Sequence, residues 1–357
     1  MRIGDGPRGR RMSHELIRAI RELPTKEIVV VLDHYSHLLT QFVPSAGLSE
    51  PHLLFLDNNI LQDLKKQSVD NKRKLRAYGV RLFADFMVNH SALQVELALP
   101  PAILHEFAQR SIPESESQWN VITREAHEAL GTLGMVIRSF GAASYAEAKN
   151  VLGQIVHDES VIGRAISEIK SGDWTMALRQ GSILWIPFAL SQRLAPDTLD
   201  LRYFDLGCVR WVLAALIERL ILTNKANDAR VRKTFHNEDA GILAALNKLK
   251  KSGVLQGLGD IELLSICAIG SQFHQEETET RTALTFDTKL QQALAMRSGL
   301  FATHEPFAPG QDSATDIQRK FDELMEGRRR LKVVAERDAV FRQRAAIHFG
   351  YLSSQLA

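Results

Sequence analysis

The sequence predicts an α/β fold in which a parallel sheet is combined with a mainly helical inserted segment. Two short apolar runs, 53–57 and 282–286, each end at an acidic residue or just before one, and a helical pattern follows both. This order is typical of the strand–helix units of parallel sheets. A chain of 357 residues, 45% hydrophobic and 24% charged, has an ordinary globular composition. Its length suits two domains, or one domain with a large insertion.

The first segment, 1–50, reads as a helical preface. Apolar residues recur at helical spacing between Leu16 and Leu39, and Pro24 divides them into two helices. The second of these helices carries three polar residues at a spacing that a metal site would allow: Asp33, His34 and His37. Solvent-facing polar residues are a simpler explanation for this group.

The second segment, 51–110, is expected to form the first half of the α/β unit. Its elements in order are a strand over 53–57, a helix through Ile60 and Leu64, a helix over 80–88 and an apolar piece over 93–99. Pro100 and Pro101 end the apolar piece. Pro101 suits the first turn of the next helix, which places Glu106 about one turn into that helix.

The third segment, 111–240, is expected to be a helical insertion. Ser144 and Glu147 have the spacing of a capping box at the start of one helix. The strongly apolar stretch 206–222 predicts a helix that is buried against several neighbours.

The remaining chain returns to α/β character and then becomes helical again. Segment 241–300 is expected to supply the second half of the α/β unit, with a helix after Asp260 and the strand 282–286. Segment 301–357 predicts a basic helical tail, in which long helices begin at about Thr315.

Composition excludes several classes of protein. A formal net charge of +2 is not strongly basic, so affinity for nucleic acid has to come from local patches. Cys208 and Cys267 are too few for a disulfide framework and too far apart for a zinc motif, so we expect buried thiols. No apolar stretch is long enough to cross a membrane, and the basic N-terminus lacks the apolar core of a secretory signal. We therefore expect a soluble cytoplasmic protein, with translation starting at Met1 or at Met12.

Four acidic residues share one placement in this scheme, at a strand end or in the first turn of a helix: Asp57, Glu106, Asp260 and Asp287. The carboxyl ends of parallel strands meet at one edge of a sheet, where such folds bind ligands. Clustered carboxylates repel each other unless a cation neutralises them, and an oxygen-only set suits Mg²⁺ or Mn²⁺. Each acid alone is equally well explained as a helix cap or a first-turn carboxylate. Their joint placement is what suggests a metal site.

Four motifs around these acids carry a resemblance to a known family. In chain order they are Phe-Leu-Asp-Asn-Asn-Ile (55–60), Leu-Pro-Pro-Ala-Ile-Leu-His-Glu-Phe (99–107), Gly-Asp-Ile-Glu-Leu-Leu (259–264) and Ala-Leu-Thr-Phe-Asp-Thr-Lys-Leu (283–290). In order and element type they resemble the acidic motifs of the PIN-domain nucleases, over 51–110 and 241–297. Asn58 departs from the family pattern, which usually has Thr or Ser there. The long separation between the second and third motifs requires inserted helices.

The resemblance implies a PIN-like three-layer α/β/α fold and metal-dependent hydrolysis of phosphodiester bonds, with RNA favoured over DNA. Asp57 would be the central ligand of Mg²⁺ or Mn²⁺, Asp260 and Asp287 would complete the set, and Glu106 would orient the attacking water or bind a second ion. Two residues would support these acids by hydrogen bonding: Asn59 and Thr285. Glu262 is expected to be structural. Compact members of the family are toxins held by an antitoxin, so a protein regulator, or self-association, is an open expectation.

Two groups of cations are candidates for binding the phosphate backbone. The first follows the helix after Asp57 and consists of Lys65, Lys66, Lys72, Arg73, Lys74 and Arg76. The second precedes Asp260 and consists of Arg230, Arg232, Lys233, Lys248, Lys250 and Lys251. Each group is also explained as a solvated face, and few aromatic residues are interleaved with them.

Two rival interpretations remain. A haloacid-dehalogenase-like phosphatase also begins with an acid after an apolar strand, but it needs a second Asp two positions later, where this chain has Asn59. A catalytically degenerate PIN-like scaffold would keep the fold and bind nucleic acid or a protein partner without cleaving.

Overall fold

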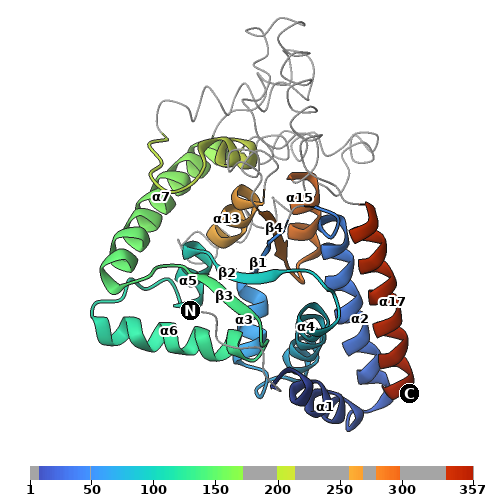
Figure 1. Cartoon of the computed structure of the whole chain (residues 1–357). Helices are drawn as coiled ribbons and strands as arrows, with labels where there is room; N and C mark the ends of the chain where they lie inside the picture. The colour runs from blue at the N-terminus through green and yellow to red at the C-terminus, as the bar shows by residue number, and fades with distance from the viewer. Residues whose placement is uncertain are drawn as a thin grey trace, which may run out of the picture.

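A four-stranded parallel sheet lies at the centre of the protein (Figure 1). The structure is a computed structural model that describes residues 8–48, 50–171, 199–213, 257–267, 279–297 and 335–356. The strands are β1 (His52–Leu56), β2 (Val95–Leu99), β3 (Val136–Phe140) and β4 (Thr280–Leu284), in the spatial order β3-β2-β1-β4. Every neighbouring pair is parallel, which confirms the α/β class and the parallel sheet.

Strand β1 occupies the interior of the sheet. It pairs with β2 on one side and β4 on the other, and all five of its residues are buried. A strand that is covered on both faces reads as a continuous apolar run, which is why this strand was recognisable in the sequence. Its C-terminal end places Asp57 at the middle of the sheet edge.

Helices surround the sheet. They are α1 (Arg8–Arg21), α2 (Thr25–Phe42), the short 3₁₀ helix η1 (Val43–Ser45), α3 (Asn58–Lys65), α4 (Asn71–Asn89), α5 (Pro101–Phe107), α6 (Glu116–Gly131), α7 (Tyr145–Ser171), α13 (Leu258–Ile266), α15 (Thr288–Arg297) and α17 (Ala335–Leu356). Figure 1 shows α2, α4 and α17 together beside the sheet, while α5, α7 and α13 lie on its opposite side.

The helical preface packs directly onto the α/β unit. Pro24 separates α1 from α2, as expected, because a proline has no backbone N–H to continue the first helix. Buried side chains of α2, among them Tyr35 and Phe42, belong to the same core as β1 and α4. The N-terminal helices therefore help to position the sheet edge.

The expectation that 111–240 is helical almost throughout is wrong at one place. Strand β3 lies inside this segment and forms the edge of the central sheet beside β2, with a register shift near Ala98. Its residues are exposed or only partly buried, so its sequence lacks the continuous apolar run of an interior strand. The α/β unit thus continues beyond residue 110.

Several local expectations are confirmed. Ser144 Oγ accepts a hydrogen bond from the Glu147 N–H at 3.2 Å, and Glu147 Oε2 accepts one from the Ala143 N–H at 2.9 Å, which together cap α7. Pro101 is the first residue of α5. Cys208 and Cys267 are both buried, and neither forms a disulfide.

Some of the expected elements lie outside the described residues. The helix expected over 206–222 is described only as far as residue 213, and the basic tail is described from Ala335 onward, as α17. Of the helices that the structure describes, none is both long enough and apolar enough to cross a membrane.

Candidate active site

Asp57 follows β1 directly and is buried, with 2% of its surface exposed. Its Oδ1 accepts a hydrogen bond from the Asn59 N–H at 3.4 Å, which makes it the N-cap of α3. Its Oδ2 accepts two more hydrogen bonds, from Asn59 Nδ2 at 3.0 Å and from Thr285 Oγ1 at 2.8 Å. The carboxylate therefore caps a helix and is also held in one orientation from two sides.

Thr285 connects Asp57 with Asp287. The Thr285 hydroxyl donates to Asp57 Oδ2 and accepts from the Asp287 N–H at 2.9 Å. Asp287 Oδ1 in turn accepts from the N–H groups of Lys289 and Leu290, at 2.9 and 3.2 Å, and so caps the start of α15. The ends of β1 and β4 are thus joined through one buried hydroxyl.

Gln41 of α2 holds Thr285 in place, and sequence reasoning missed it. Its Nε2 donates to the Thr285 carbonyl oxygen at 2.8 Å, and its Oε1 accepts from the Thr285 N–H at 3.0 Å. Nothing in the sequence distinguishes Gln41 from other polar residues of an amphipathic helix. Its role follows only from where α2 lies against β4.

The two histidines that the sequence offered as a metal group pack against an aromatic ring. The Phe286 ring centroid lies 5.1 Å from that of His34 and 6.0 Å from that of His37, and the Arg76 guanidinium lies 5.3 Å from the same centroid. Burial, followed by the positive charge of Arg76, lowers the pKa of His34. These contacts give both histidines a packing role beside the turn between β4 and α15.

Glu106 of α5 is held by the backbone that leads into α13. Its Oε1 accepts hydrogen bonds from the N–H of Gly259 at 3.1 Å and from that of Gly257 at 3.2 Å. Burial raises the pKa of Glu106, the bond from Gly259 opposes this shift, and the negative charge of Asp57 raises the pKa further. The two carboxyl groups are therefore close enough to repel each other.

Two glycines allow this approach. Gly257 has a φ of 117°, in the region that favours glycine. A Cβ added at Gly259 would lie 2.4 Å from Ile103 Cδ1 and 3.3 Å from Glu106 Oε2. Asp260 follows in the first turn of α13 and is partly buried, so the third expected acid lies next to the group that binds Glu106.

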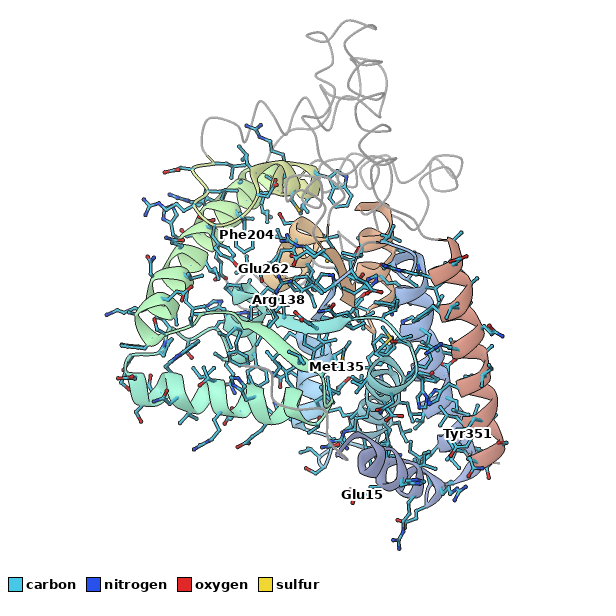
Figure 2. The ribbon with its side chains drawn as sticks, in the orientation of Figure 1. Glu15, Met135, Arg138, Phe204, Glu262 and Tyr351 are labelled. Atoms are coloured by element: carbon cyan, nitrogen blue, oxygen red, sulfur yellow. The ribbon has the colours of Figure 1, made fainter. Side chains whose placement is uncertain are left out.

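Glu262, labelled in Figure 2, lies two positions after Asp260 and binds the start of α5. Its Oε2 accepts from the Ala102 N–H at 2.8 Å and from the Ile103 N–H at 3.3 Å, and Tyr203 donates its hydroxyl to Oε1. Burial raises the pKa of Glu262 to about 8, against these hydrogen bonds. Its contacts are those of a structural acid that caps a helix.

The residues at the sheet edge suit a hard divalent cation in chemistry. Their donors are carboxylate oxygens, and Asn58 Oδ1, next to Asp57, is a buried acceptor without a hydrogen-bond partner. The repulsion between Asp57 and Glu106 is the kind of conflict that a bound cation removes. No three of the four acids have ligand atoms within 4.8 Å of one another, so the carboxylates would have to draw together around an ion.

A pocket of about 470 Å³ opens beside this edge. It is lined by Asn59, Gln62, Asp63, Lys65, Lys66, Asp70, Lys72, Arg73, Arg76, Phe107 and Gln109. Five of the six cations expected near Asp57 are among these residues. The sixth, Lys74, lies over the Tyr78 ring at 5.8 Å from its centroid.

Arg73 and Arg76 of the pocket wall each lie beside a carboxylate. Arg76 Nη1 donates to Asp63 Oδ2 at 3.5 Å, and Arg73 Nε lies 4.0 Å from Asp70 Oδ2. One buried nitrogen of each guanidinium, Arg73 Nη1 and Arg76 Nε, makes no hydrogen bond. The geometry of guanidinium groups matches that of phosphate oxygens. Lys65 is already engaged, with Glu125 Oε2 at 2.5 Å and the Phe107 centroid at 4.8 Å.

Hydrogen bonds connect Asp57 with both expected supporting residues, Asn59 and Thr285, and through Thr285 with Asp287. The charge of Asp57 acts on Glu106, which is bound to the backbone just before Asp260. Five of the six cations in the first expected group line the pocket beside Asn59. The second group of cations, Arg230, Arg232, Lys233, Lys248, Lys250 and Lys251, lies outside the described residues. Comparisons of the chain with protein-family models, with curated proteins and with solved structures find no match.

Proposed function

We propose that this chain is a metal-dependent nuclease with a PIN-like three-layer α/β/α fold, which hydrolyses phosphodiester bonds, preferably in RNA. One observation carries the proposal: Asn59 contacts Asp57 at the sheet edge (the acidic edge) and also lines the pocket of about 470 Å³ with its five cations (the basic pocket). Its Nδ2 donates to Asp57 Oδ2 at 3.0 Å, and the same residue lines the pocket together with the cations Arg73 and Arg76. A phosphate chain bound in this pocket would pass beside Asp57.

The acids Asp57, Glu106, Asp260 and Asp287 would hold Mg²⁺ or Mn²⁺, with Asn58 Oδ1 as a further oxygen donor. When bound, such an ion lowers the pKa of water and stabilises the charge that develops on the phosphate. The hydrogen bonds of Asn59 and Thr285 fix the Asp57 carboxylate before substrate arrives, which reduces the reorganisation needed during reaction.

Glu106 would orient the attacking water and accept its proton. Its Oε1 accepts hydrogen bonds from the N–H groups of Gly259 and Gly257, which fix the carboxylate before substrate arrives. In the reaction, the oxygen of a water forms the new bond to phosphorus, and Glu106 takes the proton from that water. The bond from phosphorus to the leaving oxygen breaks, and solvent protonates that oxygen.

The basic pocket would position the substrate. Lys66, Lys72, Arg73 and Arg76 line a cavity large enough for one or two phosphate groups of a strand, whose neutralisation releases counterions. The preference for RNA rests on the resemblance of the four acidic motifs. A protein regulator, or a second copy of this chain, belongs to the same proposal.

The proposal is tested by cleavage of end-labelled RNA and DNA of matched sequence by the purified full chain, with Mg²⁺, with Mn²⁺ or with a chelator. We expect metal-dependent cleavage, reduced by about 100-fold or more in Asp57→Ala and in Asp260→Ala. Glu128→Ala removes an exposed acid of α6 and serves as the control. A folded, metal-loaded wild type that cuts neither polymer would establish the non-catalytic scaffold in place of the nuclease.

A further inference from the structure

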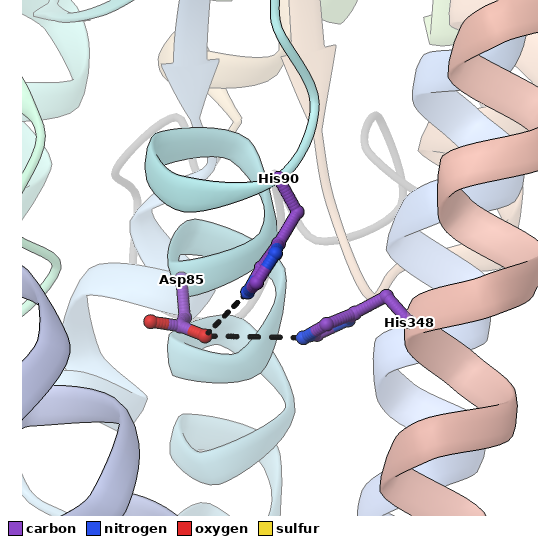
Figure 3. Close-up of side chains that lie close together, drawn as sticks. All are labelled: Asp85, His90 and His348. Atoms are coloured by element: carbon purple, nitrogen blue, oxygen red, sulfur yellow. Dashed lines mark ion pairs between the residues drawn. The ribbon is translucent and has the colours of Figure 1, made fainter.

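A second cluster of ligand-type side chains lies away from the sheet edge, where the C-terminal helix packs on α4 (Figure 3). Asp85 comes from the last turns of α4, His90 follows the end of that helix, and His348 comes from α17. Asp85 Oδ2 lies 3.9 Å from His90 Nε2 and 3.9 Å from His348 Nε2. One potential ligand atom from each residue lies within 4.8 Å of the other two.

These separations are too long for hydrogen bonds, which join nitrogen and oxygen at about 2.7–3.2 Å. They are close to those of a metal site, because zinc bonds of about 2.0–2.1 Å in a tetrahedron place the ligand atoms about 3.4 Å apart. A closure of about 0.5 Å would bring each imidazole nitrogen to that distance from the carboxylate oxygen. The His90 side chain is 46% exposed and has room to make this movement.

The other polar atoms of two of these side chains are already bound by neighbours. Asn89 Nδ2 donates to Asp85 Oδ1 at 2.8 Å, and the Tyr35 hydroxyl is hydrogen-bonded to His348 Nδ1 at 2.8 Å. Both contacts come from outside the cluster, and on its inner side Asp85 Oδ2 lies 3.9 Å from His348 Nε2. Outer hydrogen bonds of this kind position the carboxylate and imidazole ligands of metal sites.

The surroundings hold one imidazole in place. The Phe86 ring centroid lies 5.4 Å from that of His348, and the His90 ring centroid lies 4.5 Å from it. The side chains of both Asp85 and His348 are 5% exposed, so these two groups have little freedom to turn away from each other.

We propose that Asp85, His90 and His348 bind a divalent transition-metal ion of the zinc class, which fastens α17 to the end of α4. Two imidazoles and one carboxylate favour zinc and its neighbours over Mg²⁺, which prefers oxygen ligands alone. Arg344, one helical turn before His348, donates from Nη1 to the His90 carbonyl oxygen at 3.0 Å, so the same two segments are already in contact. The exposed side of His90 leaves a fourth position for water.

The test is zinc binding by the metal-free full chain, measured by calorimetric titration with millimolar Mg²⁺ present to occupy the sheet edge. We expect one tight zinc ion per chain, a zinc-dependent rise in the thermal unfolding midpoint, and visible absorption bands of a low-symmetry site when Co²⁺ replaces zinc. His90→Ala should weaken zinc affinity by at least about 10-fold and abolish the thermal shift. His14→Ala removes an exposed histidine of α1 and is the matched control.

Two further variants make the outcome unambiguous. Asp57→Ala should keep the zinc site, because the proposal places it outside the acidic edge. His348→Gln should lose the zinc site. If this substitution at a buried position prevents folding, His90→Ala, at an exposed position, still tests the proposal. The proposal is overturned if the wild type binds no zinc, or if His90→Ala binds it as tightly as the wild type does.

Discussion

The Thr285 hydroxyl lies 2.8 Å from Asp57 Oδ2 and also accepts the Asp287 N–H at 2.9 Å, so that one buried side chain joins the ends of β1 and β4. The side-chain amide of Gln41, in α2, is hydrogen-bonded to both the N–H and the carbonyl oxygen of Thr285 and so fixes the backbone there. The orientation of Asp57 therefore depends on two segments far from it in sequence. This dependence leads to the first prediction.

Replacing Thr285 by Val removes the hydrogen bond while keeping the shape of the side chain. We expect a loss of stability of about 1–3 kcal/mol, because Asp57 loses a buried donor, and a fall in nuclease rate of at least about 10-fold. Urea unfolding and cleavage of labelled RNA measure the two effects. Thr285→Ser keeps the hydroxyl and should retain most of both properties; equal effects of Val and Ser would show that the hydrogen bond is not the cause.

Gly259→Ala tests the close approach of α13 to Glu106. The added Cβ would lie 2.4 Å from Ile103 Cδ1, so the two segments must move apart, at a cost of about 1–3 kcal/mol. We expect a lower unfolding midpoint and a lower nuclease rate, since the N–H that binds Glu106 moves as well. Ile103→Val removes the clashing methyl group.

The double variant provides the control for this prediction. The double variant Gly259→Ala, Ile103→Val should lose less unfolding free energy than the two single variants lose together, because the smaller valine leaves space for the new methyl group. If the two losses measured by urea unfolding simply add, the contact between residue 259 and Ile103 does not limit how closely α13 approaches α5.

Glu262 should make the stability of the protein depend on pH. Burial raises its pKa from 4.5 to about 8, so the folded state holds a proton that the unfolded state releases. The stability that this proton adds is fully present below pH 4.5 and is lost as pH rises toward about 8. Over this range the free energy of unfolding falls by at most about 1.4 kcal/mol per pH unit. Glu262→Gln should remove that part of the slope in urea unfolding measured across this range.

Tyr203→Phe gives the opposite check on Glu262. The tyrosine hydroxyl donates to the carboxylate and thereby lowers the pKa of Glu262, so its removal should raise that pKa. The loss of stability should still begin near pH 4.5, where the unfolded state releases its proton, but it should continue to a higher pH than in the wild type. Glu128→Gln, at an exposed acid, should leave the profile unchanged; a wild-type profile that matches that of Glu262→Gln would contradict the assignment.

The basic pocket should control affinity for nucleic acid. Arg73→Ala removes a cation with a buried unpaired donor, and we expect weaker RNA binding and a slope of log affinity against log salt that is smaller by about 0.7. Lys149→Ala removes an exposed cation of α7 that does not line the pocket, and it should change neither quantity. Fluorescence anisotropy at several salt concentrations measures both, and identical slopes for the two variants would place the substrate elsewhere.

Local chemistry made much of the fold predictable. The continuous apolar run of β1 and the prolines before α2 and α5 encode their elements within a few neighbouring residues, so the sequence alone identified them. The acids Asp57 and Asp287 were found for the same reason, since each directly follows an apolar strand or its turn. Strand β3 was not predicted, because an exposed edge strand needs no apolar run. Its pairing with β2 also depends on residues far apart in the sequence.

The sequence by itself determined which residues end the strands and which types of ligand they carry. Only the tertiary structure decided that Gln41 holds Thr285, that Gly259 approaches Glu106, and that His348 meets Asp85. The physical reason is that hydrogen bonds and ligand distances depend on how separate helices pack. That packing depends on the whole core, so a local sequence pattern does not predict it.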